Sequence, residues 1–229
     1  YPDCILFYRL GDFYEMFFDD AIKVSRELEL TLTGRDCGLP ERAPMCGVPY
    51  HSVELYLKRL VERGYKIAIC EQLTDPSAGK LVERDVIRIV TPGTLIESSM
   101  LEDGANNYIC CLYYEKQADC ALCFADLSTG EMSLLVPEID NRQATVLDAL
   151  ARYQPAELVL NADAMDWKAV MEFVKLRLQC TVSLRDDSCF DPQRNYTLVL
   201  NQFQVSSLQM LGLTEEGPDA CAVCGMFDY

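Results

Sequence analysis

The sequence is poor in histidine, in basic side chains and in long apolar runs. Among its 229 residues His51 is the only histidine, so the chain lacks the means for a serine–histidine relay elsewhere. A metal at His51 would need co-ligands, of which Cys46 is the nearest, and a hydrogen bond within its loop is the simpler role. No apolar run approaches the roughly 20 residues that a membrane-spanning helix requires, and the first residues, YPDC, do not resemble a secretory signal. We therefore expect no membrane partner and no hydrolase built on a serine–histidine pair.

Basic residues are outnumbered by acidic ones. The chain has 20 Lys and Arg against 36 Asp and Glu, which gives a formal net charge of −16. Binding to nucleic acid normally needs a basic surface that neutralises phosphates, so the charge alone argues against a nucleic-acid partner. It also predicts solubility and no attraction to anionic membranes. Hydrophobic residues make up 50% of the chain, an ordinary globular composition, and the length suits one large domain or two small ones.

Two further absences concern the ends of the chain and nucleotide binding. The sequence does not begin with methionine and stops at Asp228-Tyr229, so we expect a segment of a longer protein. It has no Gly-x4-Gly-Lys-Ser/Thr motif for phosphate binding, because Gly79-Lys80 lacks the earlier glycine and the following hydroxyl residue. We expect no catalytic residue, no cofactor and no enzyme activity in this chain by itself.

Cysteine, by contrast, is abundant, with twelve residues. They are scattered among apolar residues, as in residues 109–112, ICCL, where free cysteine packs as a small hydrophobic side chain. Without a secretory signal, reduced thiols in a cytosol are the better interpretation. Two Cys-x-x-Cys pairs, Cys120/Cys123 and Cys221/Cys224, could form a four-thiolate zinc site. An offset of three within a strand points to opposite faces, and neither pair contains a turn-forming glycine, so no metal is expected.

The first part of the chain has the pattern of a compact α/β domain. Strands are expected at residues 4–10, 30–33, 65–70 and 86–90, and helices at residues 14–28 and 53–63. The first helix is predicted from apolar residues spaced by four, three and four between Phe17 and Leu28. A loop rich in glycine and proline follows the second strand. We assign residues 1–92 to a mixed-sheet α/β domain and residues 93–104, which contain glycine and serine, to a linker.

Residues 105–229 have a different pattern. Three strands in close succession are expected at residues 108–114, 120–127 and 131–136, with hairpin-length connections. Helices at 142–153 and 166–178 then alternate with strands at 157–160 and 181–184, and the tail, roughly 205–227, holds one or two short helices broken at Gly217-Pro218. This order is typical of a ribonuclease H-like fold. The expected fold class is therefore α/β with two domains.

The most informative stretch is residues 11–17, GDFYEMF, which we place where the first strand leads into the first helix. Phe13 beside the acidic Glu15 is unusual for a core segment. An exposed Phe can act as a wedge that partly unstacks a base step and kinks the duplex by roughly 20–90°, and a glutamate can accept a hydrogen bond from a base. Alternatively, Phe13 is a hydrophobic staple and Glu15 a first-turn charge favoured by the helix dipole. The residues alone favour this second interpretation.

A family resemblance reverses that weighting. Residues 7–17, FYRLGDFYEMF, resemble the mismatch-recognition signature of the MutS family of DNA mismatch-repair proteins, whose core is Phe-x-Glu. Four further segments resemble the same family in order: residues 45–52 (MCGVPYHS), 68–72 (AICEQ), 82–84 (VER) and 88–94 (RIVTPGT). Residues 126–131, DLSTGE, resemble the family's connector domain, which is also ribonuclease H-like. The resemblance covers nearly the whole chain and is stronger in its first part.

The resemblance implies that residues 1–92 recognise mismatched double-stranded DNA. Phe13 would stack on a mispaired or unpaired base from the minor groove, and Glu15 would hydrogen-bond that base. Arg35 and Arg88 would contact the DNA backbone, and Asp12 is a further candidate for such a contact.

For the whole protein the resemblance implies a cytoplasmic, nucleoid-associated homodimer that binds ATP and Mg in regions beyond Tyr229. Residues 105–229 would connect the DNA-binding domain to those regions. They would also offer a docking face for a downstream repair protein of the MutL type.

Two other functions stay open on the residues alone. A metal-dependent nuclease of the ribonuclease H-like type would need several carboxylates that converge on two metal ions. The candidates are Asp126, Glu131, Asp163 and Asp187. The spacing of these residues does not clearly place them at adjoining strand ends. A protein-interaction module without DNA binding would suit the net charge of −16.

Overall fold

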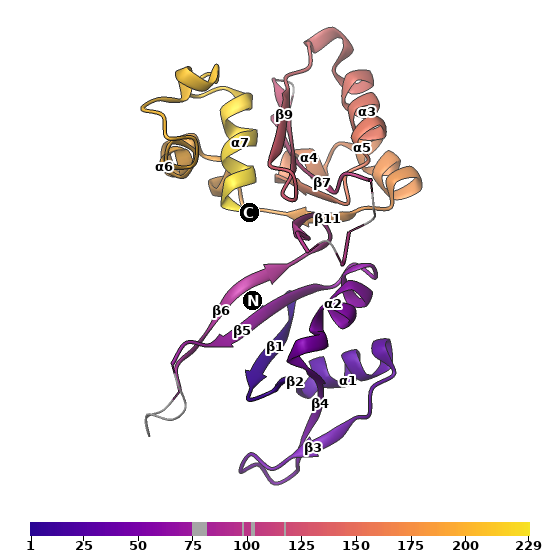
Figure 1. Ribbon diagram of the computed structural model, residues 1–229. Helices are drawn as coiled ribbons and strands as arrows, with labels where there is room; N and C mark the ends of the chain where they lie inside the picture. The colour runs from indigo at the N-terminus through magenta and orange to yellow at the C-terminus, as the bar shows by residue number, and fades with distance from the viewer. Residues whose placement is uncertain (75–81, 98, 102–103, 117) are drawn as a thin grey trace. The chain divides into compact units, whose positions relative to one another are not determined.

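The computed structural model describes residues 1–74, 82–97, 99–101, 104–116 and 118–229. The chain divides into two compact units, Tyr1–Asp103 and Gly104–Tyr229, each with one mixed sheet and its own helices (Figure 1). The expected α/β class with two domains is confirmed. The Gly79-Lys80 pair lies outside the described residues.

The first unit is built on a six-stranded sheet. Its elements are β1 (Cys4–Leu10), β2 (Phe13–Phe17), α1 (Phe18–Leu28), β3 (Thr33–Arg35), β4 (Ala43–Pro49), η1 (Tyr50–Ser52), α2 (Val53–Val61), β5 (Lys66–Gln72), β6 (Arg84–Val90) and η3 (Pro92–Thr94). The strand order is β3-β4-β2-β1-β5-β6. Strands β1 and β5 are parallel, and the other neighbouring pairs are antiparallel.

Helices α1 and α2 cover one face of this sheet (Figure 1). Their apolar side chains pack against a core that includes Ile5 and Phe7 of β1 and Tyr14 and Met16 of β2. Successive side chains of a strand point to opposite faces, so the intervening residues lie on the other face, which we call the open face. From these two strands it carries Leu6, Tyr8, Leu10, Phe13, Glu15 and Phe17.

The expectation of a helix from residue 14 was wrong for its first turn. Residues 13–17 form β2, and the helix begins at Phe18. The helical spacing is real from Ala21 to Leu28, where the buried residues lie. Before that point the alternation of Tyr14 and Met16 with outward residues decides the structure, because β2 pairs on both edges, with β1 and with β4.

Strand β4 was expected to be loop, because residues 43–49 contain two prolines and a glycine. In the structure it pairs with β2 along one edge and with β3 along the other. Pairing partners distant in sequence thus override a weak strand propensity. Pro44 and Pro49 lie near the two ends of the strand, where a missing N–H is tolerated. Strand β3, expected at residues 30–33, forms two to three residues later.

Residues 93–104 were assigned to a linker, but much of this segment belongs to the first unit. Leu95 and Met100 are buried in its core, and the division between the units falls after Asp103. Between these two residues lie a glutamate and two serines, and a proline and a glycine precede them. This local composition resembles that of a linker, although the side chains of Leu95 and Met100 pack into the core of the first unit.

The second unit has a five-stranded sheet in the order β11-β10-β7-β8-β9. Its longer elements are β7 (Tyr108–Tyr114), β8 (Cys120–Asp126), β9 (Glu131–Leu135), α3 (Arg142–Tyr153), β10 (Glu157–Leu160), α4 (Ala162–Met165), α5 (Lys168–Phe173), a π-helical turn (Val174–Leu178), β11 (Thr181–Leu184), α6 (Pro192–Phe203) and α7 (Pro218–Asp228). Short 3-10 turns lie at Ile139–Asn141, Asp187–Phe190 and Leu208–Leu211. Helices α3 and α5 pack on one face of the sheet, and α6 and α7 lie on the other (Figure 1).

Most of the second unit was predicted; the short helix α4 and the longer helix α6 were missed. The N-terminus of α6 carries a recognisable start: the Asp191 carboxylate accepts a hydrogen bond of 2.9 Å from the Gln193 N–H, and Pro192 occupies the first turn. The helix expected at residues 166–178 is α5 continued by the π-helical turn.

Gly225 lets α7 lie close to the sheet. An ideal Cβ at this position would be 2.5 Å from Cδ1 of Phe190 and 2.9 Å from Sγ of Cys111. Neither partner can move freely, because Phe190 and Cys111 are both buried in the core of the second unit.

We therefore expect Gly225→Ala to lower the free energy of unfolding by about 1–3 kcal/mol, because overpacking outweighs the better helix propensity of alanine. Urea unfolding followed by circular dichroism measures the change. The matched test is Gly225→Ala in a Phe190→Leu background, where we expect a smaller cost. An equal cost in both backgrounds would contradict the packing explanation.

Candidate nucleic-acid interface

Phe13 is the first residue of β2 and follows the two-residue turn Gly11-Asp12. Leu10 of β1 pairs with Phe13, so the turn is a tight hairpin. Gly11 has φ +58°, a conformation that glycine adopts at little cost. The Phe13 side chain is 46% exposed. The ring therefore stands at the edge of the open face, on a hairpin and not on the strand-to-helix corner that we expected.

The hairpin turn is held from two sides. The Gly11 N–H donates a hydrogen bond of 3.1 Å to Oε1 of Gln72, and the Tyr50 N–H donates one of 2.9 Å to the Asp12 carbonyl. Arg9 donates from Nε to the Gly11 carbonyl, and its guanidinium carbon lies 3.8 Å from the centre of the Tyr50 ring. These contacts join the turn to β5 and to the end of β4.

Tyr14 anchors β2 from the covered side of the sheet. Its hydroxyl donates a hydrogen bond to the Glu71 carboxylate on β5. Burial, assisted by Glu71, raises the pKa of Tyr14 to about 12, so the hydroxyl keeps its proton at neutral pH. Tyr14 lies between Phe13 and Glu15 in the chain, and this bond therefore helps to fix the strand that carries both.

Glu15 lies two residues along β2, opposite Tyr8 in β1 and Gly47 in β4. Its side chain is 17% exposed, and its Oε2 accepts a hydrogen bond from Nη1 of Arg35 on β3. The Arg35 guanidinium also lies 5.9 Å from the centre of the Phe17 ring. The structure thus brings three of the expected site residues, Phe13, Glu15 and Arg35, to the open face.

Arg88 has a different environment on β6. It forms an ion pair with Glu97, and its Nη2 donates a hydrogen bond of 3.2 Å to the Thr94 carbonyl. Burial tends to raise the pKa of Glu97, but hydrogen bonds, first among them that of Arg88, bring it below its usual value. A phosphate contact by Arg88 stays a prediction, and it would require this ion pair to open. Asp12 is exposed at the tip of the hairpin.

An apolar groove of about 610 Å³ lies on the open face beside Phe17 and Arg35. Sequence reasoning missed it because the expected helix would have removed this part of the sheet. Phe18, which lines the groove, has φ +53° and is 52% exposed, an uncommon combination for a bulky side chain. The apolar and aromatic residues of its lining are Leu6, Tyr8, Leu10, Phe17, Phe18 and Ala43.

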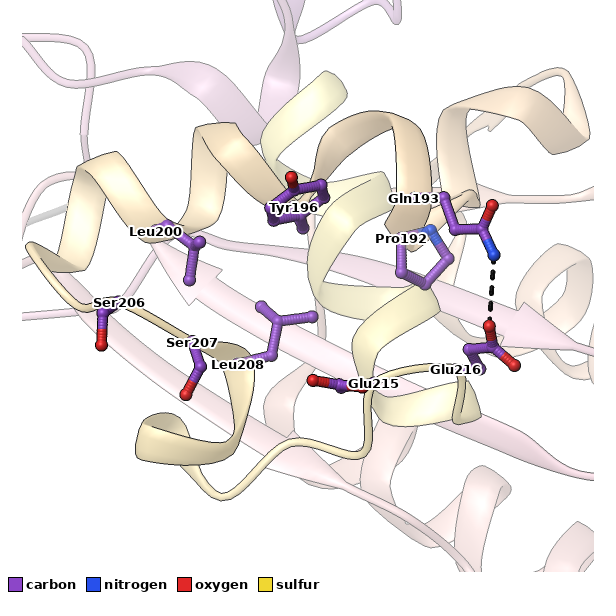
Figure 2. Close-up of a pocket in the computed structure, with 9 residues that line it drawn as sticks. All are labelled: Pro192, Gln193, Tyr196, Leu200, Ser206, Ser207, Leu208, Glu215 and Glu216. Carbon is purple, nitrogen blue, oxygen red and sulfur yellow. Dashed lines mark hydrogen bonds between the residues drawn. The ribbon is translucent and has the colours of Figure 1, made fainter.

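A second hollow, of about 280 Å³, lies in the second unit beside α6 (Figure 2). Tyr196 and Leu200 of α6 and Leu208 of the following turn supply apolar surface. Two exposed acids, Glu215 and Glu216, stand at its rim, and Glu216 accepts a hydrogen bond of 3.1 Å from Nε2 of Gln193.

The carboxylates expected for a nuclease site serve structural roles. Oδ1 of Asp126 accepts hydrogen bonds from the N–H of Ser128 at 2.9 Å and from its hydroxyl at 2.6 Å, and Oδ2 accepts one from the Asn107 N–H at 3.2 Å. Burial tends to raise the pKa of Asp126, but these bonds bring it below its usual value. Asp163 caps the Lys116 N–H in another part of the unit. Across the described ranges, no three His, Cys, Asp or Glu side chains are grouped so that they could hold a metal ion.

The cysteine pairs and the histidine also have simple environments. Cys120 and Cys123 pack into cores on opposite faces of the sheet, as the strand period predicts. Burial raises the pKa of Cys120 to about 11 and that of Cys123 to about 12. His51 is exposed, and its ring meets the Tyr50 ring edge-on. In the part of the chain that the structure describes, no helix is long and apolar enough to cross a membrane.

Comparison with known proteins places this arrangement in a family. The sequence model of MutS domain I matches residues 1–99, and that of MutS domain II matches residues 107–229. The chain is 50% identical over 202 residues to the DNA mismatch repair protein MutS of Clostridium tetani, covering 88% of this chain and 22% of that protein. It is 45% identical over 230 residues to the protein of the same name from Lachnoclostridium phytofermentans, covering 100% of this chain and 24% of the relative.

A third relative, the DNA mismatch repair protein MutS of Clostridium botulinum (strain 657), is 59% identical over 159 residues, which are 69% of this chain and 17% of that protein. The chain therefore spans less than a quarter of the length of these relatives. Domain II alone matches more than half of the chain, and the domain I match covers most of the remainder. This chain belongs to the MutS family of DNA mismatch-repair proteins.

Proposed function

We propose that this chain is the mismatch-sensing and connecting part of a MutS-type DNA repair sensor. Phe13 enters a weakened base step from the minor groove, and Glu15 hydrogen-bonds the base that is probed. The observation that carries the proposal is the half-exposed Phe13 ring on a tight hairpin that Gln72, Tyr50 and Arg9 hold in place.

The energetics explain why one ring can serve many kinds of mismatch. Unstacking a base step costs a few kcal/mol, and the cost is lower where base pairing is already broken. Bending the duplex is likewise easier at a flexible defect. A wedge therefore responds to the deformability of the duplex and not to its sequence. Glu15 adds a hydrogen-bond acceptor for the exposed base.

The net charge of −16 is compatible with this proposal if sensing of the mismatch and binding of phosphates are divided between regions of the protein. A fragment that samples a defect can be acidic if other regions of the protein bind the phosphates. We propose that such regions, absent from this chain, also bind ATP and Mg and form the homodimer. The protein would act in the cytoplasm on chromosomal DNA.

The second unit would dock a downstream repair protein of the MutL type. The hollow beside α6 has an apolar lining and an acidic rim at Glu215 and Glu216. Such a surface suits a partner segment that presents an apolar side chain flanked by Lys or Arg, because opposite charges favour encounter and fix the register.

Replacement of the wedge gives the first test. In a protein of full family length that carries this sequence, we expect Phe13→Ala to reduce the preference for mismatched over matched duplex by about tenfold to hundredfold, the value of a lost base–aromatic stack. Fluorescence anisotropy with both duplexes measures the preference.

Phe18→Ala is the matched control, because it removes an equally exposed ring at the other end of β2. We expect it to keep the preference. A Phe13→Ala protein that still discriminates would refute the proposed function.

The isolated chain should bind mismatched DNA weakly or not at all, because its acidic surface offers few phosphate contacts. Titration of chain and full-length protein at several salt concentrations measures the difference. Tight, salt-insensitive binding by the isolated chain would contradict the proposed division of labour.

The docking face is tested by charge reversal. We expect Glu216→Lys to weaken binding of a MutL-type protein by about threefold to tenfold and to slow association. Glu172→Lys on α5 is the control, since it makes the same charge change on an exposed residue of the other helical layer. Equal effects of the two variants on association rate would mean that the hollow is not the docking face.

A further inference from the structure

The open face presents Glu15 as one half of an ion pair. Arg35 belongs to β3, and β4 lies between β3 and β2. The Arg35 side chain nevertheless reaches Glu15, and its Nη1 donates to Oε2. Within the part of the chain that the structure describes, Oε1 of Glu15 accepts no hydrogen bond. One carboxylate oxygen is thus held by the protein, and the other is left for a different donor.

Gly47 provides the space for this arrangement. It is the β4 residue opposite Glu15. A Cβ at this position would lie 3.2 Å from the Tyr14 carbonyl oxygen and 3.5 Å from Cγ of Glu15. The contact with Glu15 would be an ordinary one, but the approach to the Tyr14 carbonyl oxygen is tight, so a Cβ here would press on the backbone that leads into Glu15.

Pairing with Arg35 changes what a DNA duplex meets at this face. A lone carboxylate would repel phosphates, whereas the pair has no net charge. A free glutamate side chain also loses rotamer entropy when it is ordered, and a carboxylate that is ordered before binding avoids much of that cost. Glu15 is 17% exposed and Arg35 45% exposed, so the carboxylate is the more buried partner.

We propose that Arg35 is a positioning residue for Glu15: it holds Oε2 so that Oε1 faces the base beside the Phe13 wedge, with Gly47 as the opening that permits this geometry. The proposal rests on the proposed role of Glu15 in mismatch binding. It assigns Arg35 a task different from the backbone contact that the family resemblance implies, since its guanidinium is used within the sheet.

A double-mutant cycle in a protein of full family length separates the two roles. The variants are Arg35→Ala, Glu15→Ala and the pair, and the measured quantity is the ratio of dissociation constants for matched and mismatched duplex at several salt concentrations. We expect Arg35→Ala to lower this ratio by about threefold to tenfold. In the Glu15→Ala background the same change should have no further effect, and the salt dependence of binding should stay the same.

Three companion variants sharpen the test. Arg35→Lys keeps a single donor and should retain part of the ratio, while Arg26→Ala on α1 removes the same charge from the helical layer and should leave it unchanged. Gly47→Ala alters no charge, and we expect it to lower the ratio because its Cβ presses on the Tyr14 carbonyl oxygen and shifts the backbone that carries Glu15.

The opposing results are distinct. Equal losses from Arg35→Ala in both backgrounds, with a salt slope smaller by about one, would identify a phosphate contact and overturn the positioning role. An unchanged ratio in Gly47→Ala would overturn the part assigned to Gly47. If Glu15→Ala alone preserved the ratio while Phe13→Ala abolished it, the positioning role would fail together with the role of Glu15, although the wedge would stand.

Discussion

The side chains of strand β2 point alternately into the core of the first unit and to its open face. This alternation links the packing of the core to the residues of the candidate site. Tyr14 and Met16 point into the core, so Phe13, Glu15 and Phe17 must point to the open face. A slip of one residue would exchange the two sets completely. Pairing with β1 and β4 on both edges prevents such a slip. The packing beneath the helices therefore determines which side chains are available above the sheet.

Charged side chains of the first unit are also used within the fold. Several arginines of the first unit form ion pairs within the fold, and these pairs are Arg9–Glu71, Arg35–Glu15, Arg63–Glu27 and Arg88–Glu97. A guanidinium paired in this way contributes little to general attraction for phosphates. Because the net charge is −16 as well, the proposed function requires little affinity of this surface for an undistorted duplex. Selectivity for a defect then depends on a difference in deformation energy, which a weakly attracting surface does not mask.

Sequence patterns predicted much of the architecture, and the failures have identifiable physical causes. The three strands that open the second unit were found because strand-like segments follow one another in close succession with hairpin-length connections. Strand β4 was missed because its prolines and glycine oppose local strand formation, and the stabilising partners are distant in the chain. Residues 14–17 were assigned to a helix, since a five-residue strand directly before a helix has no separate period of its own.

For the candidate site, Phe13 and Glu15 were named through family resemblance, because the residues alone favoured a staple and a helix-dipole charge. The error in secondary structure matters for the chemistry. On a helix, residues two apart lie about 200° from each other around the axis and do not share a face. On a strand they share one face, about 7 Å apart along the chain direction. Only the strand lets a wedge and a hydrogen-bond acceptor meet adjacent parts of one disrupted base pair.

A wedge also has to be stiffer than the stack that it opens. If the hairpin yielded first, the cost of unstacking would be replaced by the smaller cost of moving the turn, and matched and mismatched duplexes would become alike. The turn at Gly11-Asp12 is attached to β5 through Gln72 and to the end of β4 through Tyr50. Each bond contributes about 1 kcal/mol, which is comparable to the few kcal/mol of a base step only when the bonds act together. In the proposed function, discrimination would thus arise from the rigidity of the whole hairpin, with the exposed Phe13 ring as its contacting end.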